Sequence, residues 1–184
     1  MGSLMKTIIA IFLLLVLQSE PATPQSLLED ICNHTKNPKF CLTTFQSDPR
    51  TSSAKDVLSL AKIGLELAMK DSAKTQRYIH VLSTSKRTEP IFKPALNECV
   101  EEYKRVAASF RSAYLEVKDG EYETANYDTL TAADYAGNCE KVLANAKAHI
   151  QSVSDGIQVT KYFSSIGDRV TTILWTSQPP ASNP

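Results

Sequence analysis

The residues able to do chemistry are scattered along this 184-residue sequence and form no catalytic pattern. His34, His80 and His149 lie far apart, and the sequence has no GxSxG nucleophile elbow, glycine-rich phosphate loop or HExxH zinc motif. A zinc site would need closely spaced Cys or His pairs. Several acids fall in helical runs that indicate a solvated face, such as Glu98, Glu101 and Glu102. The apolar neighbours of His80 predict a partly buried imidazole. We therefore expect no enzyme activity, no metal site and no cofactor.

An export signal is predicted at the start of the chain, over residues 1–25. Lys6 precedes an apolar run of about ten residues, and a polar stretch with two prolines follows. Ten helical residues extend about 15 Å, half of a hydrocarbon core of about 30 Å, so the run is too short for a membrane anchor. Ser19, Ala22 and Ser26 each fit as the last residue removed. The mature product is expected to be secreted, with no membrane span.

Export changes how the four cysteines are interpreted. Cys32, Cys41, Cys99 and Cys139 are an even set, which in an oxidising compartment indicates two disulfides. Three pairings are possible, and the short separation of the first two cysteines makes Cys32–Cys41 with Cys99–Cys139 the simplest. Asn33-His34-Thr35 becomes a candidate N-glycosylation sequon, with Asn33 as the acceptor.

Composition favours one globular domain. Lys and Arg number 20, as do Asp and Glu, and a nucleic-acid binder would need a basic surplus. A hydrophobic content of 42% with 22% charged residues excludes a disordered chain and a multi-span membrane protein. Only 6 glycines make an all-β sandwich, with its many tight turns, a poor fit.

Apolar residues recur at three- and four-residue steps over most of residues 55–176, which predicts amphipathic helices. Asp119-Gly120 and Asp155-Gly156 are expected to end helices. The third helix is expected to place on its core stripe Leu130, Ala133, Ala136, Cys139, Leu143, Ala146 and Ile150.

These elements predict an all-α fold in one domain over residues 26–176. An up-down-up-down four-helix bundle would occupy residues 55–176, after a short helical hairpin over 26–46. A Cys99–Cys139 bond would then join the second and third bundle helices inside the core. Residues 177–184 are expected to be a disordered tail.

Acidic residues gather between residues 118 and 140. This stretch contains six acids and a single base, Lys118. An acidic surface on a neutral protein suits a basic partner, although ordinary solubility is the alternative explanation. The six acids are Asp119, Glu121, Glu123, Asp128, Asp134 and Glu140.

Short motifs around the cysteines resemble those of a known family. Residues 31–41 read Ile-Cys-Asn-His-Thr-Lys-Asn-Pro-Lys-Phe-Cys, and residues 47–50 read Ser-Asp-Pro-Arg. Tyr103 follows Cys99 after three residues, and Asp119-Gly120-Glu121-Tyr122 leads through Ala132-Ala133 to Cys139-Glu140. In this order, over about residues 27–176, these motifs are similar to those of the plant invertase and pectin methylesterase inhibitors.

The resemblance implies the same bundle and hairpin, the same two disulfides, and a secreted protein that inhibits a cell-wall enzyme in a 1:1 complex. It places the protein in the apoplast or cell wall, with the vacuole as the other possibility. In one branch the second to fourth helices cover the cleft of pectin methylesterase. In the other, a Pro-Lys-Phe element early in the third helix occupies the active site of invertase.

The target branch is judged from the residues after Gly120. They read Glu121-Tyr122-Glu123 without Pro-Lys-Phe, and the Pro38-Lys39-Phe40 element lies instead in the hairpin. Pectin methylesterase is therefore the favoured partner, and invertase (β-fructofuranosidase) the alternative. Asn138 and Leu143 stand where many members carry Thr and Phe.

The inhibitory surface is expected to use side chains that lie off the core stripes of the second and third bundle helices. A bundle that binds a small apolar ligand in an internal cavity is a second class of function. A structural wall protein would need repeats or Pro-rich tracts, which the sequence lacks. The expected surface residues are Glu101, Lys104, Arg105, Tyr122, Asn126, Asp128 and Thr131.

Overall fold

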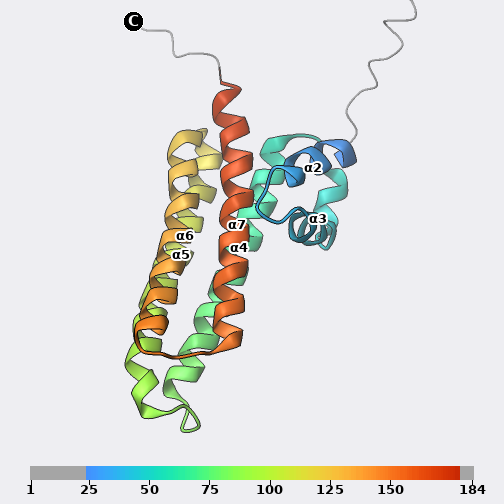
Figure 1. Ribbon diagram of the computed structural model, residues 1–184. Coiled ribbons are helices and arrows are strands. Elements are labelled where there is room, and N and C mark those ends of the chain that lie inside the picture. Colours follow the sequence, from blue (N-terminus) through green and yellow to red (C-terminus); the bar gives the residue numbers. More distant parts are fainter. Residues whose placement is uncertain (1–23, 179–184) are drawn as a thin grey trace, which may run out of the picture.

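A computed structural model describes residues 24–178 (Figure 1). Two short helices, α2 (Pro24–Asn33) and α3 (Pro38–Gln46), precede four long ones. No strand occurs in the described part of the chain, and the all-α prediction is confirmed. The long helices are α4 (Val57–Thr84), α5 (Lys93–Asp119), α6 (Tyr122–Asn145) and α7 (Gln151–Thr176), with short 3-10 helices η1 (Pro49–Ser53) and η2 (Pro90–Phe92) before α4 and α5.

The predicted signal segment up to residue 23 and residues 179–184 of the predicted tail lie outside the described residues.

The four long helices form the predicted up-down-up-down bundle. Each packs against its neighbours in the chain, and α7 closes the ring against α4. Figure 1 shows the α2–α3 hairpin beside one half of this bundle, next to α7. Of the described helices, none is both long and apolar enough to cross a membrane.

One of the two predicted helix breaks is correct and the other is wrong. Gly120 ends α5 in the left-handed region, with φ of 85°, as expected for a glycine that reverses a helix. Asp155 and Gly156 instead lie inside α7, and the chain turns earlier, at Lys147, with φ of 54°. The third bundle helix therefore ends at Asn145, so Ala146 and Ile150 belong to the connection.

Gly156 is needed for close packing. A Cβ atom added there would lie 2.7 Å from Cγ2 of Thr75, so glycine allows α7 to approach α4 closely. Glycine in a helical sequence thus has two meanings, a turn or a close contact, and local sequence does not separate them.

The predicted core stripe of α6 is correct at Ala136, Cys139 and Leu143, and wrong by one residue earlier in the helix, where Thr129 and Ala132 are buried in place of Leu130 and Ala133. The buried positions recur at alternating steps of four and three residues, whereas Leu130 is 45% exposed. The buried side chains are mostly small, and the prediction favoured a bulky leucine beside them. They are Ala125, Thr129, Ala132, Ala136, Cys139 and Leu143.

The hairpin is held by a disulfide and a cap. Cys32 is bonded to Cys41, and the side chain of Asn37 accepts a hydrogen bond from the backbone N–H of Phe40 at 3.0 Å, which caps α3. Arg169 of α7 lies 3.5 Å from a carboxylate oxygen of Asp30, so an ion pair also ties α2 to the bundle.

The Ser-Asp-Pro-Arg motif joins the hairpin to the bundle. Asp48 caps η1 and accepts hydrogen bonds from Nε and Nη2 of Arg50 at 2.9 and 2.8 Å. The other guanidinium nitrogen of Arg50 pairs with Glu66 on α4. Because Arg50 stabilises the ionised carboxyl, the pKa of Asp48 is lowered to about 2. The Ser-Asp-Pro-Arg motif therefore has a structural role, which is to hold the hairpin against the bundle.

Candidate functional site: the surface of α5 and α6

The candidate site is the surface that α5 and α6 present side by side, which we call the α5/α6 face. These helices are adjacent in the bundle and antiparallel, joined by the tight turn at Gly120 (Figure 1). The face consists of Arg105, Ser112 and Glu116 from α5, with Tyr127, Asp128, Thr131 and Tyr135 from α6.

The two helices of this face are joined covalently and by polar contacts. Cys99 and Cys139 form a disulfide with a Cα–Cα distance of 4.6 Å, and both are fully buried. Glu102 is also buried, so its predicted place on a solvated face is wrong, and it accepts a hydrogen bond from Arg105 at 2.8 Å and one from Asn138 of α6 at 3.4 Å. The Arg105 guanidinium carbon lies 5.7 Å from the ring centroid of Tyr135, within cation–π distance. These contacts fix the position of α5 relative to α6.

Carboxyl groups meet near the Gly120 turn. Burial raises the pKa of Glu116, and the charges of Asp128 and Glu121 raise it further. Burial also raises the pKa of Asp128, although a hydrogen bond with Ser112 opposes the shift. One oxygen of Glu116 is buried without a hydrogen-bond partner among the described residues. Protonation of these groups is therefore easier here than in free carboxylic acids.

The predicted surface residues do not form one patch. Arg105, Asp128 and Thr131 lie on the α5/α6 face, and Tyr122 packs against the core from the first turn of α6. The side chain of Thr131 donates a hydrogen bond to the Tyr127 carbonyl at 3.0 Å. Three of the predicted residues point elsewhere: Glu101, Lys104 and Asn126.

Asn126 joins α6 to α7. Its side-chain nitrogen lies 2.8 Å from a carboxylate oxygen of Asp168 and 3.0 and 3.1 Å from the hydroxyls of Thr171 and Thr172. The same nitrogen lies 3.2 Å from the Asp168 carbonyl, so its two hydrogens are shared among four acceptors. The side chain of Asn126 is thus engaged in contacts between α6 and α7.

Glu101 and Lys104 lie in a groove between α4 and α5. They form an exposed ion pair at 2.6 Å, three residues apart on α5. The groove has a volume of about 640 Å³ and also contains His80, which is exposed rather than partly buried as its apolar neighbours had predicted. The two predicted residues therefore lie on the side of α5 that faces away from α6.

Sequence reasoning missed the exposed aromatic side chain of the α5/α6 face, Tyr127, which is 68% exposed. An exposed tyrosine on a rigid surface is a typical anchor of protein interfaces. The α6 heptad of small residues was the pattern that could have revealed it, because it leaves Tyr127 outside the core stripe. Leu115 and Leu130 are 45% exposed each but lie outside this face. Leu115 follows Asn97 of the α4/α5 groove by about five turns of α5, and Leu130 follows Asn126, which contacts α7, by about one turn of α6.

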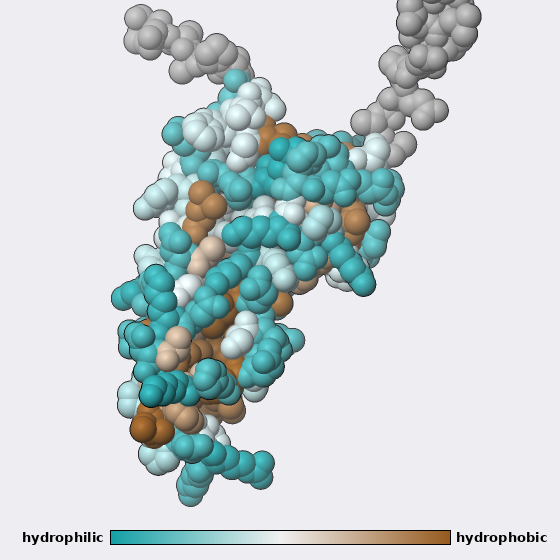
Figure 2. Space-filling view, in the orientation of Figure 1, coloured by the Kyte–Doolittle hydropathy of each residue, from teal (hydrophilic) through white to brown (hydrophobic). Residues whose placement is uncertain are grey.

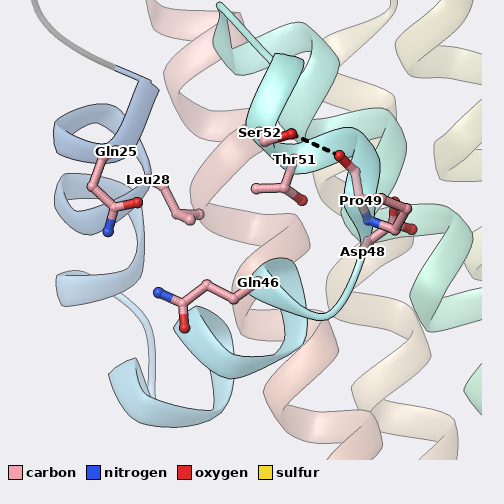
Figure 3. A pocket seen from close by; sticks show the side chains of 7 residues that line it. All are labelled: Gln25, Leu28, Gln46, Asp48, Pro49, Thr51 and Ser52. Carbon is pink, nitrogen blue, oxygen red and sulfur yellow. Dashed lines mark hydrogen bonds between the residues drawn. The ribbon is translucent and has the colours of Figure 1, made fainter.

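A second recess lies where the hairpin meets η1 (Figure 3). It has a volume of about 410 Å³, and Figure 3 shows Gln25 and Leu28 of α2 facing Thr51 and Ser52 across it. Its one carboxylate, Asp48, is already held by Arg50, and Ser52 donates its hydroxyl to the Pro49 carbonyl at 2.9 Å. This arrangement provides no pairing of a nucleophile with a base.

The bundle interior is filled with side chains. Large residues that are less than 2% exposed fill the central positions of α4, α5 and α7: Leu65, Tyr103, Phe110, Ile157 and Ile166. Tyr103 makes a hydrogen bond with the hydroxyl of Thr160 at 3.2 Å, and burial raises its pKa. Over residues 24–178, no group of three or more metal-ligating side chains is placed to hold an ion.

Comparison with known proteins identifies the family. Residues 26–170 match the family described as plant invertase/pectin methylesterase inhibitor. The chain belongs to this family. Its members are enzyme inhibitors, which agrees with the inhibitor role expected from the sequence.

This chain is similar both to a fructosidase inhibitor and to a pectinesterase inhibitor. It is 30% identical over 145 residues to cell wall / vacuolar inhibitor of fructosidase 2 of Arabidopsis thaliana, an alignment that covers 74% of this chain and 80% of that one. It is 33% identical over 114 residues to a pectinesterase inhibitor of Actinidia deliciosa, with 62% and 60% covered.

Solved structures support the fold. A crystal structure of a mutant form of a pectin methylesterase inhibitor from Arabidopsis matches with a TM-score of 0.68 at 22% identity, covering 78% of this chain and 93% of that one.

Proposed function

We propose that the mature protein is a secreted inhibitor that covers the active-site cleft of a pectin methylesterase with its α5/α6 face in a 1:1 complex. The observation that carries this proposal is the rigid pairing of α5 with α6 by Cys99–Cys139, which presents Tyr127 outward. A preformed surface loses little conformational entropy on binding. We expect a double variant, in which alanine replaces both Tyr122 and Asp128, to inhibit the enzyme more weakly.

We also propose that the protein catalyses no reaction. The acids near the α5/α6 face lie beside other acids or structural partners, and the described recesses pair no nucleophile with a base. A family of enzyme inhibitors points to the same conclusion. The inhibitory activity would then come from binding alone.

The choice of target rests on the turn between α5 and α6. Glu121-Tyr122-Glu123 follows Gly120 here, and the Pro-Lys-Phe element of the invertase branch does not. An invertase is the second candidate, favoured by the similarity to a fructosidase inhibitor over 80% of that protein.

Export and glycosylation belong to the same proposal. Residues 1–25 would act as the signal peptide, residues 26–176 as the inhibitor domain and residues 177–184 as a tail, in the apoplast and cell wall or in the vacuole. Asn33 is exposed at the end of α2, in the hairpin rather than on the α5/α6 face. A glycan at Asn33 would therefore leave that face open.

A parallel titration tests the target. The oxidised mature protein is added in increasing amounts to a plant pectin methylesterase and to a plant acid invertase in mildly acidic buffer. The proposal predicts loss of esterase activity that is complete near one inhibitor per enzyme. Loss of invertase activity alone would show that the second candidate is correct, and activity in both assays at excess inhibitor would reject the inhibitor function.

A further inference from the structure

The groove between α4 and α5 has the features of a separate ligand site. It lies on the opposite side of α5 from the α5/α6 face and is about 640 Å³ in volume, within the usual range of ligand-binding clefts. Gln76, Arg77, His80 and Val81 line it from α4, and the facing α5 residues are Asn97, Val100, Glu101 and Lys104.

Available positive charge is the first of these features. Arg77 forms no ion pair with any described residue. The partner of Lys104 is Glu101, and their side chains are 56% and 59% exposed, so this ion pair is weak and a competing carboxylate can replace it.

The connection from α4 to α5 continues the basic surface. Lys86 and Arg87 lie there with one acid, Glu89, just beyond the groove, and Lys93 begins α5. The groove, the connection and the first residue of α5 together carry five Lys and Arg residues against two acids, on a chain whose formal net charge is zero. This local excess attracts an anionic ligand that is longer than the groove itself.

The uncharged lining suits a sugar chain. The amides of Gln76 and Asn97 and the His80 imidazole can exchange hydrogen bonds with hydroxyl groups. Val81, which is 61% exposed, and the buried Val100 offer an apolar strip for the C–H face of a sugar ring. In the view of Figure 2, apolar atoms also reach the surface of the lower part of the bundle, between hydrophilic side chains.

We propose that this groove binds a chain of uronic acid sugars with free carboxylates, the form of pectin that a pectin methylesterase leaves. The inference rests on the proposed target, because that enzyme exposes carboxylates by removing methyl esters. Carboxylates pair with Arg77, Lys104 and the bases of the connection, and hydroxyls with the amides. Because the α5/α6 face lies on the other side of α5, the inhibitor can bind its enzyme and the enzyme's product together, which retains it where de-esterification has occurred.

Isothermal titration calorimetry at low ionic strength tests the site directly, with the full mature chain and an oligogalacturonate of about eight sugars. The test variant is Arg77→Gln/Arg87→Gln. The matched control is Lys55→Gln/Lys141→Gln, which also removes two positive charges, from exposed sites outside the groove. We expect saturable binding, weakened on the order of tenfold in the test variant and unchanged in the control.

Two further arms identify the chemistry. Glu101→Gln removes the acid of the groove and should tighten binding about threefold, an effect that a loss of structure would not produce. The fully methyl-esterified oligomer should not bind. Equal binding of the esterified oligomer, equal weakening in the control variant, or absence of saturable binding would each overturn the proposal.

The result remains separable from the proposed function. Complex formation with pectin methylesterase, followed by size-exclusion chromatography without pectin, reports the α5/α6 face alone. Complex formation without oligogalacturonate binding would reject only the groove, whereas oligogalacturonate binding without complex formation would reject only the proposed target.

Discussion

Gly167 of α7 lies directly against Thr129 of α6. A Cβ atom at Gly167 would be 2.6 Å from Cγ2 of Thr129, closer than real Cβ contacts, and Thr129 is fully buried. With Gly156 against Thr75, it lets α7 approach both of its neighbours closely. The bundle thus depends on small residues where helices cross.

Gly167→Ala should destabilise the fold by about 1–3 kcal/mol, because the added methyl group must displace buried atoms. Gly137→Ala is the matched control. Its added Cβ would meet nothing within 4 Å on α6, so the variant should gain about 0.5–1 kcal/mol from the better helix propensity of alanine. Urea denaturation followed by circular dichroism measures both, and a neutral Gly167→Ala would contradict the close-packing explanation.

The Cys99–Cys139 disulfide should be the larger of two covalent contributions to stability. It closes a loop of 40 residues, against 9 for Cys32–Cys41, and chain entropy predicts about 4 kcal/mol for the longer loop and about 2.5 for the shorter. We expect Cys99→Ala/Cys139→Ala to lower the thermal midpoint more than Cys32→Ala/Cys41→Ala. The reverse order in differential scanning calorimetry would show that α5 and α6 do not rely on this bond.

Asn126→Ala should cost about 1–2 kcal/mol, because Asp168 loses the donor at 2.8 Å. Thr124→Ala, an exposed position on the same helix, is the control and should change little. Thermal denaturation measures both. Equal stability of the two variants would mean that the α6–α7 contact contributes nothing.

Stability should fall in strong acid. Arg50 lowers the pKa values of Asp48 and Glu66, so their folded-state pKa values lie below the unfolded ones of about 4. Their stabilisation is present above the unfolded pKa and is lost as the pH falls toward about 2. A midpoint that stays constant from about pH 5 to about pH 2 would contradict this account.

Other carboxyls act in the opposite direction as the pH rises. Burial raises the pKa values of Asp71 and Asp128 above their unfolded values, so ionisation between the two values destabilises the folded state. The thermal midpoint should therefore be highest in mild acid. Asp71→Asn, which cannot ionise, should lose less stability than the native chain between about pH 4 and about pH 7, as measured by circular dichroism.

The long-range architecture was predictable because it depends on periodicity. Helical spacing over residues 55–176 and the even set of cysteines predicted the bundle and two disulfides, and both are present. The ends of the helices were harder to predict from the sequence. Gly120 and Gly156 both follow an aspartate, yet only the partner of Gly156, Thr75, explains why that glycine lies inside a helix.

The candidate site was less predictable, because side-chain direction depends on small shifts of a helical stripe. Leu130 was assigned to the core, although Thr129 occupies that position. Asn126 was polar and off the predicted stripe, but its partners lie more than 40 residues away on α7. Such tertiary partners are not visible in the spacing of one helix.

The most direct test of the account is titration of a pectin methylesterase with Tyr127→Ala. Its matched control is Tyr78→Ala, which removes one exposed aromatic side chain outside the α5/α6 face. With unchanged circular dichroism spectra, the account predicts at least about tenfold weaker inhibition for the first variant and native inhibition for the control. Native inhibition by Tyr127→Ala would show that the α5/α6 face is not the inhibitory surface.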